Sequence, residues 1–223
     1  MYEIYLLDLD NTLLDFDAAE INSFHTLLRS YEIPYEEELF TQYKKINKNF
    51  WSLLEQGKVD KDTLRIGRFK EFFGSIQMSV DAEEAEMRFQ SYLSDGAEMM
   101  PHAKETLVRL KESGKKIYSA SNGVYETQVK RLQTAGLYHF FEDMFVSEKI
   151  GFEKPDRNFF DYCFEHIRDF DPSKTIMVGD SLTSDIQGAL NSGIDSCLYA
   201  PKGGSQTEKA THTITDLNEL LSL

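Results

Sequence analysis

The chain has 223 residues, of which 41% are hydrophobic and 28% are charged, so it can form a sizeable globular core and shows no signature of disorder. Its net charge of −14 argues against an extended nucleic acid as partner, because a field of that sign repels a polyanion. No stretch approaches the roughly 18 consecutive apolar residues of a membrane-spanning helix.

Two further features concern the compartment. Cys163 and Cys197 form no C-x-x-C pair and have no ligand-like spacing, which indicates reduced thiols. The first residues lack the basic start and the long apolar stretch of a signal peptide. We therefore expect a cytoplasmic protein.

Short, mostly apolar runs predict five buried strands, at residues 3–8, 116–121, 144–146, 175–179 and 195–199. Helical patterns lie between or beside these runs, at residues 103–113, 124–135, 156–168 and 184–192. Alternating strands and helices of this kind are typical of βαβ units on a parallel sheet, the α/β class.

A different pattern separates the first strand from the second. Residues 17–98 contain no convincing strand, and apolar side chains recur there at helical spacing, for example at Leu39, Tyr43, Ile46, Phe50 and Leu53. A second helix is predicted over 62–73, and Asp81 with Glu84 resembles the capping box of a third. Because about 80 residues are too many for a loop, we predict an all-helical domain at 17–98 and an α/β domain built from 1–16 and 99–223.

Polar side chains follow four of the predicted strands. They are Asp8 and Asp10, then Ser121 and Asn122, then Lys154, and finally Asp180 and Asp185. Each taken alone is explained by ordinary turn or cap chemistry. The carboxyl ends of parallel strands meet at one edge of the sheet, however, and ligands bind there. Together these residues predict a site with several carboxylates, a hydroxyl and a lysine.

The same residues resemble the motifs of the haloacid dehalogenase (HAD) superfamily. The run from Asp8 to Leu13, Asp-Leu-Asp-Asn-Thr-Leu, is similar to motif I of its phosphatases, D-x-D-x-T. Ser121 and Lys154 match motifs II and III, and Gly179-Asp180-(x)4-Asp185 matches the acidic motif IV. The helical insertion resembles a cap domain of that superfamily. This resemblance implies a Rossmann-like parallel sheet with the strand order 5-4-1-2-3.

The resemblance also implies a role for each residue. Asp8 would be the nucleophile that forms an aspartyl-phosphate, and Asp10 would act as general acid and base. The implied cofactor is Mg²⁺, held by the Asp8 carboxylate, the Asp10 backbone carbonyl and Asp180, with Asp185 as an indirect or alternate ligand. Ser121 and Lys154 would bind the phosphoryl oxygens, with Asn122 as a further donor.

Asp10 favours phosphate chemistry over dehalogenation, because the dehalogenases that resemble this pattern lack an aspartate at the second position of motif I. A phosphomutase keeps both aspartates and stays open on motif I alone. A non-catalytic phospholigand-binding module would usually have lost Asp8 or Asp10, and both are present.

The fuller pattern resembles the noncanonical pyrimidine nucleotidases of the superfamily, which hydrolyse nucleoside 5′-monophosphates. It consists of motif I, Ser-Asn-Gly after the second strand, and Arg68-Phe69 in the insertion. The subgroup commonly has threonine where this chain has Ser121, a conservative difference.

Phe50, Trp51, Arg68 and Phe69 are candidate substrate contacts, although most aromatic residues of such an insertion must form its core. The alternative substrates are phosphoglycolate or a sugar phosphate. A small phosphorylated substrate is thus expected, and both a monomer and a homodimer stay open.

Overall fold

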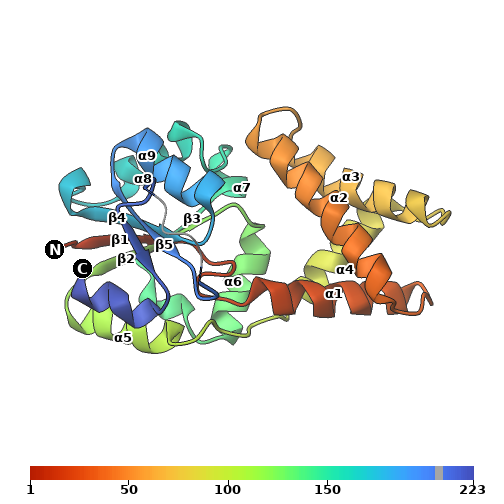
Figure 1. Cartoon of the computed structure of the whole chain (residues 1–223), viewed down its shortest axis with the longest axis horizontal. Coiled ribbons are helices and arrows are strands. Elements are labelled where there is room, and N and C mark those ends of the chain that lie inside the picture. Colours follow the sequence, from red (N-terminus) through yellow and green to blue (C-terminus); the bar gives the residue numbers. More distant parts are fainter. Residues whose placement is uncertain (204–207) are drawn as a thin grey trace. The chain divides into compact units, whose positions relative to one another are not determined.

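The computed structural model describes residues 1–203 and 208–223. Within these ranges six strands form one sheet, in which all neighbours are parallel and the order is β3-β2-β1-β4-β5-β6 (Figure 1). The strands are β1 (Ile4–Leu7), β2 (Lys116–Ser121), β3 (Asp143–Val146), β4 (Thr175–Gly179), β5 (Asp195–Tyr199) and β6 (His212–Ile214). The predicted order of the first five is confirmed.

The sequence reading missed the sixth strand, so the prediction of five strands is corrected. β6 is three residues long and pairs with β5 through Cys197–His212, Leu198–Thr213 and Tyr199–Ile214. Its sequence, His-Thr-Ile, has one strongly apolar residue, and only that residue is buried. An edge strand this short does not produce the apolar run by which buried strands are recognised.

Helices cover both faces of the sheet (Figure 1). On one face lie α5 (Ala103–Glu112), α6 (Tyr125–Thr134) and the 3₁₀ helix η4 (Leu217–Ser222), and their buried leucines share a core with Tyr5 and Leu7 of β1. On the other face lie α8 (Arg157–His166) and α9 (Gln187–Ser192), which share a core with Ile4 and Leu6. This alternation along β1 follows from the two-residue period of a strand.

Short helical turns complete the α/β unit. They are η1 (Tyr138–Phe140), α7 (Ser147–Ile150), η2 (Pro172–Lys174) and η3 (Leu182–Ile186). The last is a π-helical turn, so the helix predicted over 184–192 is corrected to η3 followed by α9. A π turn is typically found at functional sites, and this one carries Asp185.

The chain divides into two compact units, one of residues 1–16 and 97–223 and the other of residues 17–96. The second boundary lies two residues before the predicted one. The helical unit consists of α1 (Phe16–Ser30), α2 (Glu37–Glu55), α3 (Lys61–Ser75) and α4 (Ala82–Leu93). The first residue of α1, Phe16, still belongs to the α/β unit. Asp81 caps α4 by accepting hydrogen bonds from the N–H groups of Glu83 and Glu84.

An aromatic cluster forms the core of the helical unit. Its fully buried members are Phe24, Tyr43, Phe69, Phe72, Phe73 and Phe89. Tyr43 lies near the centre of this cluster, with ring centroids 4.6 Å from Phe24 and 5.7 Å from Phe69. The apolar positions that recur along α2 and α3 therefore serve packing between these helices.

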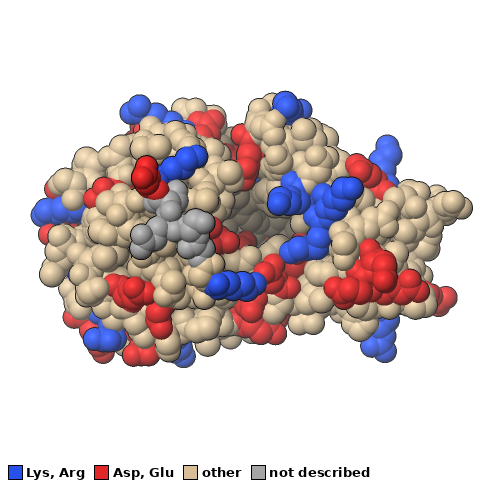
Figure 2. All heavy atoms as spheres, viewed as in Figure 1, with Lys and Arg blue, Asp and Glu red and all other residues tan. Residues whose placement is uncertain are grey.

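The surface is rich in charge. Figure 2 shows acidic side chains spread over the visible surface of each unit, with lysine and arginine side chains among them. Among the helices of residues 1–203 and 208–223, none combines the length and the apolarity needed to cross a membrane.

Candidate active site

A tight turn after β1 presents Asp8 and Asp10. The Asp8 N–H donates to the Val178 carbonyl at 2.9 Å, which continues the pairing of β1 with β4 for one residue. The chain then reverses around the Leu9 carbonyl, and Asn11 takes a left-handed conformation with φ of 57°. Asparagine is among the residues that adopt this region most readily. Asn11 also accepts a hydrogen bond from the Phe16 N–H at 3.0 Å, at the start of α1.

Lys154 lies at the centre of the site and is 1% exposed. Its Nζ donates to Asp8 Oδ1 at 2.8 Å, to Asp185 Oδ1 at 2.6 Å and to the carbonyl of Ala120. These bonds use all three ammonium protons. Burial alone would lower the pKa of Lys154, but the negative charges of Asp185 and Asp8 outweigh it and raise the pKa above its usual range. Lys154 is therefore held as a cation.

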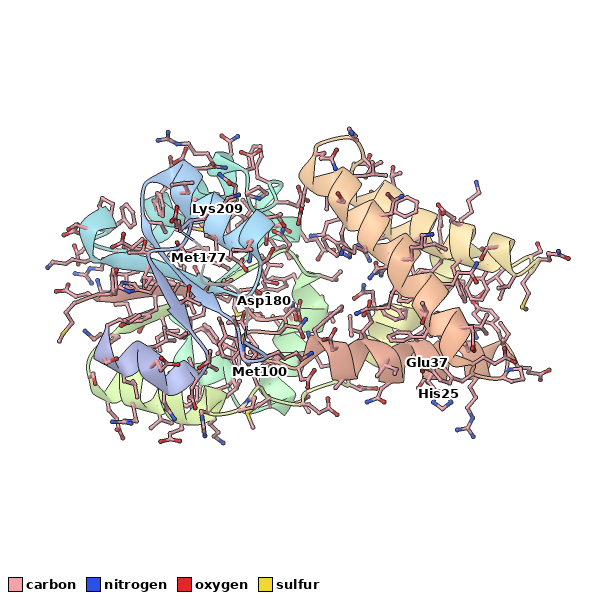
Figure 3. The ribbon with its side chains drawn as sticks, viewed as in Figure 1. His25, Glu37, Met100, Met177, Asp180 and Lys209 are labelled. Carbon is pink, nitrogen blue, oxygen red and sulfur yellow. The ribbon has the colours of Figure 1, made fainter. Side chains whose placement is uncertain are left out.

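Three carboxylates gather around this lysine. Asp8, Asp180 and Asp185 each offer one oxygen, and these oxygens lie within 4.8 Å of one another. Asp180, labelled in Figure 3, directly follows the last residue of β4, and Asp185 reaches back from the π turn. Oxygen ligands of this kind are those that Mg²⁺ prefers. When ionised, three carboxylates and one ammonium carry a formal charge of −2, which a divalent cation would balance.

Gly179 makes room for this arrangement. A Cβ atom at Gly179 would lie 2.1 Å from Asp185 Oδ2, closer than atoms can approach. The same Oδ2 accepts a hydrogen bond from the Ser181 N–H at 3.0 Å. The glycine of the Gly-Asp pair is thus required because the Asp185 carboxylate packs against the end of β4.

Burial and neighbouring negative charge raise the pKa values of Asp8 and Asp180. Burial raises the pKa of Asp8 well above its ordinary value; Lys154 opposes this, and the charges of Asp185, Asp180 and Asp10 add to it. Asp180 as a residue is exposed, yet its carboxyl group is partly desolvated by the protein around it. That desolvation, together with the charge of Asp185, raises the pKa of Asp180 to about 7. A cation at this site would have to displace protons.

The Asn122 side chain forms hydrogen bonds with the backbone of Lys154. It donates to the Lys154 carbonyl at 2.9 Å and accepts from the Lys154 N–H at 2.8 Å. Both polar groups of the Asn122 side chain are thus used to fix the backbone of Lys154. The adjacent Lys154–Pro155 peptide bond is cis.

Two polar residues of α6 complete the site, and the sequence reading missed both. Arg131 is fully buried, and its Nη1 donates to Asp10 Oδ1. Gln128 Nε2 donates to Asp10 Oδ2 at 2.7 Å and to Ser121 Oγ at 3.0 Å. The available signal was their position relative to Leu132, since the three share the buried face of a helix that follows motif II.

The four cap candidates lie in different surroundings. Phe69 is fully buried in the aromatic core of the helical unit, and Arg68 is 3% exposed and donates to Glu86 at 2.6 Å and to Asn47 at 2.9 Å. Both therefore contribute to packing inside that unit, and neither offers a surface to a substrate. Phe50 and Trp51 are half-buried and retain accessible surface.

Comparison with known proteins gives consistent matches. Residues 5–199 match the family described as haloacid dehalogenase-like hydrolase. The protein named HAD-hydrolase YfnB, from Bacillus subtilis, is 36% identical over 90% of this chain and 85% of its own length. A crystal structure of YfnB bound to magnesium has a TM-score of 0.93 to this chain, with 35% identity, and covers 99% of this chain and 97% of that one.

Two further relatives have names that state an activity. Pyrimidine 5′-nucleotidase PynA of Streptococcus pneumoniae is 37% identical over 90% of this chain and 84% of its own length. Pyrimidine 5′-nucleotidase YjjG of Escherichia coli is 29% identical over 97% of this chain and 95% of its own length.

Proposed function

The chain belongs to the haloacid dehalogenase-like hydrolases, and from that premise we propose that it hydrolyses phosphate monoesters through an aspartyl-phosphate on Asp8. The observation that carries the proposal is the position of Asp8, buried beside a lysine and two further carboxylates. A carboxylate nucleophile needs its charge balanced before it can approach a phosphate dianion. Lys154 supplies one positive charge at hydrogen-bond distance from Asp8.

The reaction has two phosphoryl transfers. In the first, an Asp8 carboxylate oxygen attacks phosphorus, the bond from phosphorus to the ester oxygen breaks, and Asp10 donates a proton to that leaving oxygen. In the second, Asp10 takes a proton from a water molecule, and the water oxygen attacks phosphorus. Inorganic phosphate leaves, and the Asp8 carboxylate is restored.

Ser121 and Lys154 bind the oxygens of the transferred phosphoryl group. Ser121 is 1% exposed and ends β2, so its hydroxyl is held at the same edge of the sheet as Asp8. Because the three protons of Lys154 are all donated to protein acceptors, a phosphoryl oxygen beside Asp8 would replace one of these acceptors. Donors held in place before the reaction stabilise the charge of the transition state at little reorganisation cost.

The carboxylates of Asp8, Asp180 and Asp185 fit Mg²⁺, because every ligand atom is an oxygen. When ionised, these three carboxylates and Lys154 together carry a formal charge of −2, which one divalent cation balances. The backbone carbonyl of Asp10 is a further proposed ligand. When bound, the ion neutralises charge on the phosphoryl oxygens. The crystal structure of the relative YfnB has magnesium bound, which supports this assignment.

For the substrate we propose a pyrimidine nucleoside 5′-monophosphate, in line with the names of PynA and YjjG. The residues around Asp8 bind the phosphoryl group alone, so discrimination between esters must come from other residues. Phe50 and Trp51 are the proposed stacking surface for the base, since Arg68 and Phe69 are buried. Stacking contributes about 1–3 kcal/mol per base, roughly 5- to 150-fold in kcat/KM.

A hydrolysis screen with Mg²⁺ tests this proposal. We expect UMP, dUMP and dTMP to be hydrolysed well and ribose 5-phosphate and phosphoglycolate poorly, and EDTA to abolish all activity until Mg²⁺ is restored. Trp51→Ala should lower kcat/KM for dTMP without changing that for ribose 5-phosphate. Equal efficiency on ribose 5-phosphate and dTMP would reject the nucleotidase assignment and favour a sugar-phosphate phosphatase.

A further inference from the structure

Hydrogen bonds join four side chains at the proposed active site, those of Asp10, Ser121, Gln128 and Arg131. Arg131 Nη1 donates to Asp10 Oδ1 and to Gln128 Oε1, the latter at 3.1 Å. Gln128 Nε2 donates to Asp10 Oδ2 at 2.7 Å and to Ser121 Oγ at 3.0 Å. Asp10 and Ser121 are the proposed acid/base and a phosphoryl ligand, whereas Gln128 and Arg131 have no role in the proposed reaction. All four belong to the α/β unit.

The chemistry of Arg131 fixes the direction of every bond in this set. A guanidinium can only donate, so the oxygen of the Gln128 amide must face Arg131. The NH₂ group of Gln128 then faces Asp10 and Ser121 and donates to both. As a result, both oxygens of the Asp10 carboxylate accept hydrogen bonds from α6, and the carboxyl plane is held at two points.

The same logic fixes the hydroxyl proton of Ser121. Its oxygen accepts from Gln128 Nε2 and from the Gly123 N–H at 3.0 Å. Two N–H donors occupy the two lone pairs of the hydroxyl, so its own proton is left to be donated elsewhere. A phosphoryl oxygen needs a donor of this kind.

The loop between β2 and α6 is shaped around Gln128. A Cβ atom at Gly123 would lie 2.5 Å from Gln128 Nε2 and 2.9 Å from its Cδ. A side chain at position 123 would therefore push the amide of Gln128 away from Ser121 and Asp10. The glycine of the Ser-Asn-Gly sequence leaves the space that this amide occupies.

From this geometry we infer that Gln128 and Arg131 are positioning residues of the reaction: together they orient the Asp10 carboxylate, and Gln128 makes the Ser121 hydroxyl a donor to the phosphoryl group. The inference rests on the proposed function. Since both residues act through Asp10 and Ser121 and not on the substrate in this role, their loss should lower kcat far more than it changes KM.

Steady-state kinetics with dTMP, and with p-nitrophenyl phosphate as a second substrate, test this inference in the whole protein with Mg²⁺. We expect Arg131→Met and Gln128→Met each to lower kcat by about 10- to 100-fold, the usual cost of losing a residue that orients a reacting group, with KM changed less than about threefold. Arg131→Lys keeps a donor and should recover part of the loss. The matched control is Gln133→Met, because Gln133 lies exposed on the same helix. It should keep wild-type kinetics.

A double variant separates positioning from a general structural effect. Once Asp10→Asn has removed the carboxylate, Arg131→Met should lower kcat by no more than about twofold, since effects of residues that act as a unit are not additive. A loss of the same size in both backgrounds would overturn the inference. So would wild-type kcat in folded Arg131→Met and Gln128→Met proteins, with folding checked by thermal unfolding.

The test also covers an Arg131→Met protein that does not fold and a wild-type protein that is inactive. Should Arg131→Met fail to fold, Gln128→Met and Arg131→Lys decide by the same criteria. A wild-type protein that hydrolyses neither substrate would reject the proposed function itself, and with it the roles given to α6. A lower kcat in Arg131→Met and Gln128→Met, with an unchanged kcat in Gln133→Met, would support the inference.

Discussion

Lys154 and Asp8 lie 146 residues apart in the chain, and Lys154 Nζ donates to Asp8 Oδ1 at 2.8 Å in a buried ion pair. The same ammonium pairs with Asp185 at 2.6 Å. One cation thus holds two carboxylates, one from the end of β1 and one from the π turn after β4, and Asp180 adds a third nearby. Lys154 makes the concentration of negative charge at this edge of the sheet compatible with folding.

Removal of Lys154 should therefore destabilise the protein. We expect Lys154→Met to lose about 3–5 kcal/mol of unfolding free energy near pH 8, because two buried carboxylates lose their partner. The loss should shrink toward pH 5, since the buried Asp8 carboxyl, whose pKa is already raised by burial, can take up a proton in the native variant that the unfolded chain does not hold. Urea unfolding at several pH values measures this.

The matched control for that variant is Lys174→Met, because Lys174 forms an exposed ion pair with Glu3 at the surface. It should change stability little at any of these pH values. A Lys154→Met protein as stable as wild type at pH 8 would contradict the account of the buried pair.

Magnesium binding should depend on pH. Since burial and neighbouring charge raise the pKa of Asp180 to about 7 and that of Asp8 above its ordinary value, protons compete with the cation. We expect the affinity for Mg²⁺, measured by calorimetry, to fall as the pH is lowered from about 8 to 6, with release of protons on binding.

The stability of the metal-free protein should change with pH in the opposite direction to the affinity for Mg²⁺. A carboxyl group whose native pKa is raised binds more protons in the native than in the unfolded state, so the stability of the metal-free protein falls as the pH rises through about 7. The increase in Tm caused by Mg²⁺ should thus be larger at pH 8 than at pH 6. An increase independent of pH would reject the three-carboxylate site.

Gly179 offers a test of how the acidic cluster is built. In Gly179→Ala the new methyl group would displace the Asp185 carboxylate. We expect a loss of about 1–3 kcal/mol in unfolding free energy, typical of overpacking, and weaker Mg²⁺ binding. Gly74→Ala is the control, because a Cβ there meets no atom within 4 Å and the residue lies in a helix. That change should be neutral or stabilising, and equal behaviour of the two variants would contradict the packing described for Asp185.

The strand ends could be predicted from the sequence because they combine two strong local signals. Buried strands such as β1 and β4 are short apolar runs, and a charged residue directly after such a run stands out. Asp8 and Asp180 were recognised in this way, whereas Lys154, which lies well after the end of β3, was recognised by its match to a known motif. The order of the first five strands followed from the same resemblance.

Gln128 and Arg131 show what such signals do not reveal. A polar residue on a helix is normally solvated, so the position of Arg131 on the same face as Leu132 is only a weak local signal. Its partner Asp10, 121 residues away, accounts for the burial of this charge. In the helical unit, a residue that suggested a ligand contact is a core residue. Phe69 could stack on a base by its chemistry, but it lies on the apolar face of α3 and is buried in the core.

The most direct test of the central claim is to detect the phosphorylated enzyme. Wild type and Asp10→Asn are mixed with ³²P-labelled phosphate monoester and Mg²⁺, quenched in acid, and digested to locate the label. We predict label in the peptide that contains Asp8, more of it in Asp10→Asn because the base that activates water is missing, and none in Asp8→Asn. Turnover by wild type without label in either protein, or label retained in Asp8→Asn, would contradict the aspartyl-phosphate mechanism.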